Sequence, residues 1–127
     1  MSAPTHSVRS EVYLRDSRRC ISCGSCFMLT VQHRQASGMG GRKRRPTQSE
    51  LVTACMKCNQ SYEADGQAEA LSFGWKVPRN IGKKFTVADF PVYYPLEQSW
   101  FLLNDDASRT LISLSEVEEF RKEWAVA

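Results

Sequence analysis

Two short stretches in the first half of the chain are rich in apolar and β-forming residues. The segment FMLTVQH, residues 27–33, is rich in β-forming residues and predicts a strand that ends at His33. LVTA, residues 51–54, predicts a second short strand. The segment between them, residues 36–50, contains three glycines, four consecutive basic residues and a proline, and therefore predicts a loop.

A helical pattern follows the second strand and is interrupted once. It starts at Asn59 and breaks near Asp65 and Gly66. Asp65 is suited to cap the second helical piece and Gly74 to end it. The predicted order in this part of the chain is strand, basic loop, strand and helix.

The chain changes character after Trp75. Residues 76–95 contain three prolines and predict an extended connection with short strands. Residues 99–114 predict a hairpin around the turn residues Asn104, Asp105 and Asp106.

The last segment predicts a helix. It begins with a capping-box pattern, Ser115 with Glu118. Val117, Phe120 and Trp124 then fall on one helical face, and we interpret them as packing groups.

Length and composition limit the architecture to one compact domain or a small domain with an appendage. The chain has 127 residues, 42% of them hydrophobic. It contains no apolar run of the roughly 18 residues that a membrane span needs, and its first residues lack the apolar stretch of a signal peptide. We expect a cytoplasmic protein that does not bind membranes, with residues 1–15 as a flexible tail.

The net charge of +3 is unevenly distributed. Residues 1–50 contain nine Arg and Lys against three Asp and Glu, and residues 51–127 contain eight against eleven. A basic amino-terminal half suits contact with a polyanion, because Lys and Arg supply most of the non-specific affinity for nucleic acid. A solvated basic face is the alternative.

Four of the five cysteines form two C-x2-C pairs, Cys20 with Cys23 and Cys55 with Cys58. This spacing lets a tight turn aim two thiolates at one cation, and two such pairs complete a tetrahedral four-sulfur site. The sequence therefore predicts a zinc ion. A site of four thiolates has no open position for water, so this zinc is expected to be structural and to stand in for a large core.

The fifth cysteine, Cys26, has the same spacing from Cys23. Gly24 favours Cys20 with Cys23 as the ligand pair, because a glycine relieves the turn after the second cysteine. Cys26, beside Phe27 and Met28, is then expected to be a buried apolar thiol.

Three residues outside the cysteines form a candidate catalytic group. Asn59 and Glu63 are four residues apart, so they share one face of a helix. His33, at the end of the first predicted strand, can approach that face. The three could bind a divalent cation and supply a general base; the alternative is that they are ordinary surface residues.

Several separated motifs occur together in one order: RRCISCGS, LTVQHR, GMGG, LVTACMKCN, and a glutamate four residues after that asparagine. In this combination the segment from Asp16 to Trp75 resembles the HNH endonucleases, in particular the small four-cysteine proteins of bacteriophages and bacteria. GWKVP and FPVYYPLEQSWFLL are similar to the tail often found in such phage proteins.

The resemblance implies a ββα-metal fold, also called the His-Me finger, with one catalytic divalent ion, Mg2+ or Mn2+. It implies that His33 is the general base that takes a proton from the attacking water. Asn59 is assigned a catalytic and metal-binding role. Glu63 and Gln32 complete the implied ligands of the catalytic ion, because hard cations prefer oxygen.

The sequence departs from the family pattern at three positions. Gln32 stands where an Asp or His that ligates the metal is common, Glu50 where the middle Asn is usual, and Asn59 where the final His is usual. Gln32 and His33 are also neighbours on a strand, so their side chains point to opposite faces unless the strand twists or bulges.

The basic loop lies beside this candidate site, and we expect it to hold the DNA backbone. No element that would read bases is evident, so sequence preference is expected to be weak. The predicted DNA-binding residues are Arg34, Arg42, Lys43, Arg44 and Arg45.

Together these features predict an α+β chain. Residues 16–75 are expected to form a small zinc-stapled ββα-metal domain, and residues 76–127 an extension with a β-hairpin and a helix. The expected function is that of a metal-dependent DNA endonuclease or nickase. The alternative is a non-catalytic zinc-knuckle module that binds DNA or protein. The resemblance to phage proteins suggests a terminase or another packaging protein as partner, and the oligomeric state stays open.

Overall fold

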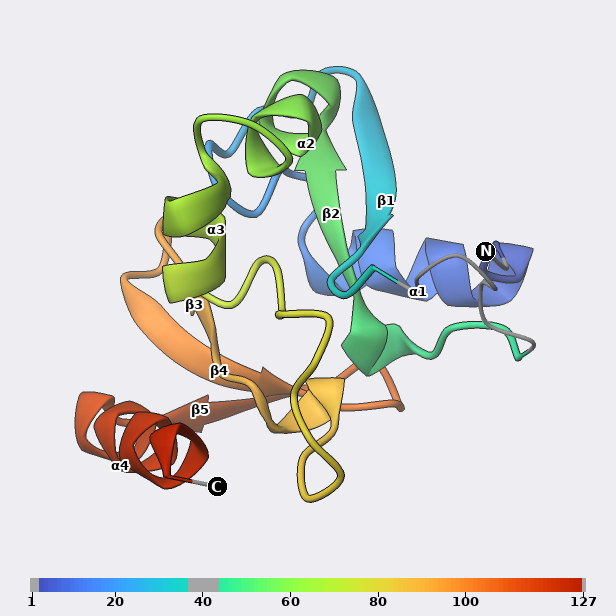
Figure 1. The fold of residues 1–127 in the computed structure, drawn as a ribbon. Helices are drawn as coiled ribbons and strands as arrows, with labels where there is room; N and C mark the ends of the chain where they lie inside the picture. Colours follow the sequence, from blue (N-terminus) through green and yellow to red (C-terminus); the bar gives the residue numbers. More distant parts are fainter. Residues whose placement is uncertain (1–2, 37–43, 127) are drawn as a thin grey trace.

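A computed structural model describes residues 3–36 and 44–126 of the chain. It is a mixed α+β structure with two small antiparallel sheets and a four-cysteine cluster (Figure 1). The elements, in order, are α1 (His6–Arg15), β1 (Leu29–His33), the 3-10 helix η1 (Gln48–Glu50), β2 (Leu51–Cys55), α2 (Met56–Tyr62), α3 (Gln67–Ser72), the 3-10 helix η2 (Val87–Asp89), β3 (Val92–Tyr94), β4 (Ser99–Leu103), β5 (Arg109–Ile112) and α4 (Leu114–Ala125).

The two strands predicted in the first half are present and pair antiparallel. Their register runs from Leu29 opposite Cys55 to His33 opposite Leu51. β1 begins at Leu29 rather than Phe27, because Met28 has a φ of 55° and so cannot continue an extended strand. The predicted end of the strand at His33 is confirmed.

The interrupted helix is confirmed, with shifted ends. α2 begins directly after Cys55, three residues before Asn59. The N-cap of α3 is Gly66, which makes no side-chain capping bond, so the predicted cap at Asp65 is wrong. Gly74 follows α3 with a φ of +76°, and a Cβ there would lie 1.8 Å from the carbonyl oxygen of Pro91. Position 74 therefore requires glycine.

The second sheet has the strand order β3-β4-β5 and contains the predicted hairpin between residues 99 and 112. The capping box of α4 is formed by Ser113 and Glu116, two residues earlier than predicted. Phe120 and Trp124 pack edge-on against Phe90, in agreement with their predicted role. In the described ranges, residues 3–36 and 44–126, no helix is long and apolar enough to cross a membrane.

One hydrophobic cluster joins the two halves of the chain. It contains Val52 and Ala54 of β2, Tyr62 of α2, and Val92 and Phe101 of the second sheet. Trp75 belongs to the same cluster and donates its indole N–H to the carbonyl of Tyr93 at 2.8 Å. The expected boundary between residues 75 and 76 thus falls inside a shared core.

Residues 6–15 form a helix and not the flexible tail that the sequence suggests. Thr5 caps α1 by accepting a hydrogen bond from the main-chain N–H of Val8, and Val12 is fully buried. The side chains of Arg15 and Asp16 are almost completely buried and form an ion pair at 2.9 Å. This helix is fixed mainly by polar contacts, which explains why a hydrophobic pattern does not reveal it.

Asp16 links α1 to both sheets. Its carboxylate accepts hydrogen bonds from the main-chain N–H of Thr53 in β2 and from the hydroxyl of Tyr94 in β3, at 3.0 and 2.6 Å. Burial and the neighbouring carboxylate of Asp16 raise the pKa of Tyr94, so this hydroxyl remains a donor. Burial opposes the charge of Arg15, but the ion pair with Asp16 outweighs it and raises the pKa of Arg15.

Arg34 is the largest fully buried side chain. Its guanidinium donates hydrogen bonds to four main-chain carbonyl oxygens, between 2.8 and 3.2 Å away, those of Ser49, Gly74, Val87 and Phe90. Burial, together with the nearby charge of Arg15, lowers the pKa of Arg34 to about 9, and the group stays charged at neutral pH. Arg34 thus connects the end of β1 with segments that lie up to 56 residues later.

We expect Arg34→Met to destabilise the protein by about 3 kcal/mol or more, because it leaves four buried carbonyls without their donor. Arg34→Lys should be intermediate, since an ammonium keeps the charge but has only three donors. Arg9→Met removes an exposed arginine of α1 and should change stability by less than about 0.5 kcal/mol. Chemical denaturation measures all three, and wild-type stability of Arg34→Met would contradict this role.

Candidate functional site

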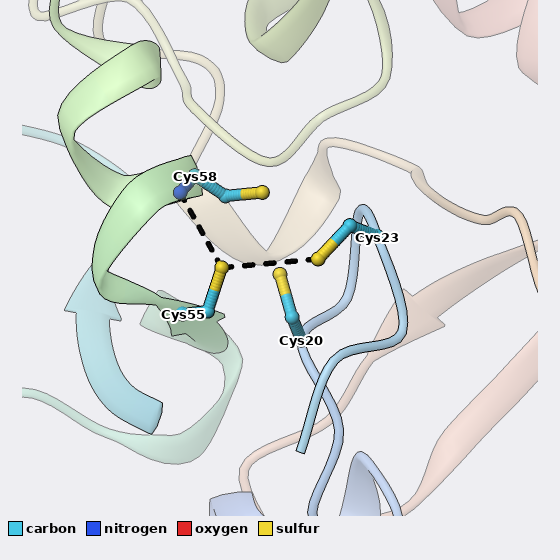
Figure 2. A group of neighbouring side chains, drawn as sticks. All are labelled: Cys20, Cys23, Cys55 and Cys58. Atoms are coloured by element: carbon cyan, nitrogen blue, oxygen red, sulfur yellow. Dashed lines mark hydrogen bonds between the residues drawn. The ribbon is translucent and has the colours of Figure 1, made fainter. Parts of the chain in front are cut away.

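Four cysteine thiols meet between the first loop and the start of α2 (Figure 2). The sulfur atoms of Cys20, Cys23, Cys55 and Cys58 all lie within 4.8 Å of one another, and those of Cys23 and Cys55 are 3.8 Å apart. A tetrahedral zinc with Zn–S bonds of about 2.3 Å places its sulfurs about 3.8 Å apart. The cluster could therefore hold a metal ion such as zinc, as the two C-x2-C pairs predict.

Local main-chain structure orients each pair of thiols toward the cluster. In the first pair the chain turns back at Gly24, whose φ is +78° and whose N–H donates to the carbonyl of Cys20 at 2.9 Å. In the second pair Cys55 is the N-cap of α2, and its sulfur accepts the main-chain N–H of Cys58 at 3.4 Å. The predicted role of Gly24 in this turn is confirmed.

Hydrogen bonds around the cluster favour a thiolate at Cys20. Burial raises the pKa of this thiol, but hydrogen bonds from Ser22 and from main-chain N–H groups outweigh burial, and the pKa falls to about 6. The hydroxyl of Ser22 lies 3.3 Å from the Cys20 sulfur and 2.7 Å from the hydroxyl of Tyr62. Burial raises the pKa of Cys23 and Cys58.

Cys26 lies outside the cluster and is exposed. The expectation of a buried thiol is wrong, because Phe27 and Met28 beside it are themselves 75% and 55% exposed and form no apolar pocket. Within residues 3–36 and 44–126, the four-cysteine cluster is the only group of three or more His, Cys, Asp or Glu residues that could hold a metal.

The side chains of Gln32 and His33 lie on opposite faces of the hairpin. β1 pairs with β2 residue for residue, so Gln32 shares a face with Val52 and His33 shares the other with Leu51. Val52, which shares the face of Gln32, and Cys55, which shares the face of His33, both belong to the same core cluster. The amide nitrogen of Gln32 donates to Thr30 at 2.8 Å, a bond that does not use the amide oxygen.

Asn59 and Glu63 lie one turn apart, as predicted. Asn59 is in α2 and half-buried, and Glu63 is the C-cap of that helix with its side chain 59% exposed. Glu63 forms an ion pair with Lys76 at 2.8 Å, and the same ammonium donates to the main-chain carbonyl of His33 at 3.2 Å. Lys76 therefore brings the end of β1 and the end of α2 together.

Lys76 is a candidate that the sequence reasoning missed. It stands in the GWKVP segment, between a core tryptophan and a buried valine. A lysine between two buried residues indicates an ammonium that needs a hydrogen-bond acceptor near the core, and this pattern could have identified Lys76.

The predicted DNA-binding arginines differ in their exposure and in their contacts. The prediction is wrong for Arg34, whose buried guanidinium cannot reach a phosphate. Arg44 has its side chain 60% exposed and pairs with Glu50 at 2.7 Å, while Arg45 is exposed and donates to the carbonyl of Ala3. Arg42 and Lys43 lie outside the described residues.

Glu50, at the position of the usual middle Asn, is a buried capping residue. Its carboxylate accepts the main-chain N–H and the hydroxyl of Thr47, both at 3.0 Å, and so caps η1. Burial opposes ionisation, but Arg44 and Thr47 outweigh it and lower the pKa of Glu50. Its contacts give it a structural role.

A second basic segment lies next to the end of β1. Residues 76–84 contain four cations and no acid, namely Lys76, Arg79, Lys83 and Lys84. A parallel bridge pairs Gln35 with Val77, and the Gln35 amide donates to the carbonyls of Pro78 and Arg79. Arg79 and Arg44 both line a hollow of about 630 Å³. The sequence shows this run of cations, but it does not show that the run lies next to the end of β1.

We expect Cys20→Ser and Cys55→Ser to lose bound zinc and to lower the unfolding temperature, because the metal links two segments separated by residues 24–54. Cys26→Ser is the matched control and should keep one zinc per chain, since this thiol lies outside the cluster. Metal content by mass spectrometry and thermal unfolding measure the two effects. A Cys55→Ser protein that kept wild-type zinc content would contradict a four-cysteine site.

The described residues thus present one cluster that could hold a metal ion, and a second location where β1, α2 and Lys76 meet. Comparisons of this chain with protein families, with curated proteins and with solved structures found no match.

Proposed function

We propose that this protein is a metal-dependent DNA endonuclease or nickase of the HNH type, with a ββα-metal fold formed by β1, β2 and α2. One observation carries the proposal: the Lys76 ammonium contacts the main-chain carbonyl of His33, at the end of β1, and the carboxylate of Glu63, at the end of α2. The main chain at the candidate base and the candidate acidic ligand, 30 positions apart in sequence (63 − 33), thus meet at one lysine. The four-cysteine cluster supports this arrangement by fastening the start of α2 to the first loop.

The types of the proposed ligands suit a hard divalent ion. Glu63 has a carboxylate, and Asn59 in α2 and Gln32 in β1 have amide oxygens. When bound, Mg2+ or Mn2+ would stabilise the negative charge that develops on the phosphate and on the leaving oxygen.

In this proposal His33 acts as the general base. A neutral imidazole takes a proton from water, the resulting hydroxide oxygen bonds to the phosphorus, and the bond from phosphorus to the 3′ oxygen breaks, after which the 3′ oxygen takes up a proton from solvent water. Imidazoles suit this step because an ordinary histidine is largely neutral at physiological pH. The products are a 5′ phosphate and a 3′ hydroxyl.

The DNA backbone would lie along the two basic segments. Arg44 and Arg45 precede β2, and Arg79 and Lys83 follow the bridge to Gln35. Contacts of this kind hold the backbone without reading bases, so we propose weak sequence preference. Genome packaging beside a phage terminase remains the proposed context.

The second candidate is a non-catalytic zinc-knuckle module that binds DNA or protein. Two observations favour this alternative. The amide of Gln32 donates a hydrogen bond to Thr30, and the side chain of His33 lies on the opposite face of the hairpin from Gln32. This module shares the structural metal and the basic segments with the nuclease, and it differs in lacking any dependence on His33.

We expect the zinc-loaded protein to relax or linearise supercoiled plasmid in the presence of Mg2+ or Mn2+ and to stop when EDTA is added. His33→Ala should lower the cleavage rate at least about a hundredfold, the contribution typical of a general base. His6→Ala removes the only other histidine and should cleave normally. Cleavage that is equal in His33→Ala and wild type would overturn the mechanism, and binding without cleavage by the wild type would favour the zinc-knuckle module.

We expect Lys83→Ala to weaken binding to a random-sequence DNA duplex and to reduce the slope of log affinity against log salt by about 1, as for the loss of one phosphate contact. Lys122→Ala removes an equally charged, exposed side chain from α4 and should leave the slope unchanged. Fluorescence anisotropy at several salt concentrations measures both. Equal slopes for Lys83→Ala and wild type would exclude this segment from the DNA contact.

A further inference from the structure

Three large apolar side chains are exposed where the first loop enters β1 and where α2 begins. Phe27, Met28 and Met56 are 75%, 55% and 40% exposed, and we call them the apolar tip. The two segments lie side by side (Figure 1), because the main-chain N–H of Met56 donates to the carbonyl of Met28 at 3.0 Å. Within residues 3–36 and 44–126, all other phenylalanines contact another aromatic ring, whereas Phe27 contacts none. The ring of Phe27 is therefore an open apolar surface.

Hydrogen bonds fix the main chain that carries the apolar tip. The N–H of Phe27 donates to the hydroxyl of Ser25 at 3.1 Å, and the carbonyl of Ser25 accepts the N–H of Cys20 at 2.7 Å. Met28 has a φ of 55°, which is unfavourable for a side chain of its size. Burial does not compensate for this conformation, because the side chain is exposed. The surrounding contacts thus hold the apolar tip in water on a fixed support, a combination found at binding sites.

The surface around the apolar tip is basic. Residues 17–33 and 51–62 contain three exposed cations, Arg18, Arg19 and Lys57, and no Asp or Glu. The guanidinium of Arg19 donates to the carbonyl of Gly24 in the same loop, and Lys57 directly follows Met56. The apolar tip therefore has cations on both of its segments. Its charge complements a ligand that combines apolar ring faces with negative charge.

Single-stranded nucleic acid has this combination, because its bases expose ring faces and its phosphates are anionic. In a duplex the base faces are covered by stacking, so a duplex offers the Phe27 ring less surface. An anionic membrane has the same charge, but an irregular loop does not enter hydrocarbon, since its main-chain polar groups lose their partners there. The chain beside Phe27 is such a loop and contains Ser25. These contacts favour unpaired bases as the ligand.

We propose that the apolar tip binds single-stranded nucleic acid, with the ring of Phe27 stacked on one unpaired base and the three neighbouring cations on the flanking phosphates. The apolar tip lies at the cysteine end of the hairpin, where Leu29 pairs with Cys55, and His33 is at the other end. This inference goes beyond the proposed function, because it needs neither His33 nor a divalent ion.

The test measures binding of a labelled 15-nucleotide DNA strand of mixed sequence, a length of about one to a few binding sites. The zinc-loaded, full-length protein is used without Mg2+ or Mn2+, and fluorescence anisotropy gives the affinity. Phe27→Ala should weaken binding at least about fivefold, as expected for the loss of one stacked base. Phe27→Trp keeps an aromatic face and should bind at least as tightly as the wild type. Leu114→Ala removes an exposed apolar side chain from α4 and should bind normally.

A strand of the same length made of abasic sites separates stacking from charge. The wild type should bind it at least about fivefold more weakly than the intact strand, and Phe27→Ala should show little of this difference. Lys57→Ala should reduce the slope of log affinity against log salt by about 0.7, as for one phosphate of a single strand, and Phe27→Ala should leave the slope unchanged. Zinc content and thermal unfolding verify that each variant is folded.

Equal affinities of the wild type, Phe27→Ala and Leu114→Ala for the intact strand, or no binding by the wild type, would overturn the proposal. Phe27-dependent binding to phosphatidylserine vesicles, without binding to the strand, would overturn it in favour of a membrane. Plasmid cleavage separates this proposal from the nuclease. Phe27-dependent binding of the strand by a protein that does not cleave would support the apolar tip and overturn the nuclease, and His33-dependent cleavage with no effect of Phe27→Ala on binding would do the reverse.

Discussion

A two-stranded antiparallel ribbon is marginal in water, so β1 and β2 depend on groups that hold both of their ends. At one end, β2 runs directly into α2 at Cys55, where four thiols from two segments meet. At the other end, the guanidinium of Arg34 binds four carbonyls, one from η1, one from Gly74 and two from the region of η2. Between these ends, the Asp16 carboxylate binds the main chain of β2. Polar and sulfur groups thus hold the ends of the ribbon, while Val52 and Ala54 of β2 are buried in the hydrophobic core.

The second sheet completes the core of the first. Trp75 bonds to the main chain of Tyr93, and the N–H of Tyr93 bonds to the carbonyl of Phe73 at 2.9 Å. The close approach of Gly74 to Pro91 fixes the distance between these segments. Residues from both sides of position 75 therefore bury one another. A small chain of this kind gains its stability from one shared core and from its crosslinks.

The elements that could be predicted from the sequence are those with local signals. The knuckle spacing, the two strands, the break between α2 and α3 and the turn at residues 104–106 all depend on neighbouring residues. Burial of Arg34 could not be predicted, because its partners are 15 to 56 residues away. Helix α1 buries one valine and otherwise uses an ion pair, so it leaves little hydrophobic periodicity.

The candidate site follows the same division. The types of its residues, a histidine at a strand end and oxygen donors one helical turn apart, are visible in the sequence. The direction in which their side chains point is not visible in the sequence, because it depends on the register of β1 against β2 and on the position of Lys76. The Gln32 side chain shares one face of the hairpin with Val52, and His33 shares the other with Leu51. A motif thus identifies the donors, and the strand register decides which of them share a face.

The partners of Arg34 also set an order of assembly during synthesis. The four cysteines and both strands of the ribbon are complete when the ribosome has passed residue 58, so a metal could already be bound to the nascent chain. The carbonyls of Val87 and Phe90, which Arg34 needs, emerge about thirty residues later. At the usual speed of translation, about 5–20 residues per second, the end of β1 that carries His33 stays incomplete for a second or more after the sulfur cluster can close. The two ends of one short ribbon therefore mature at different times.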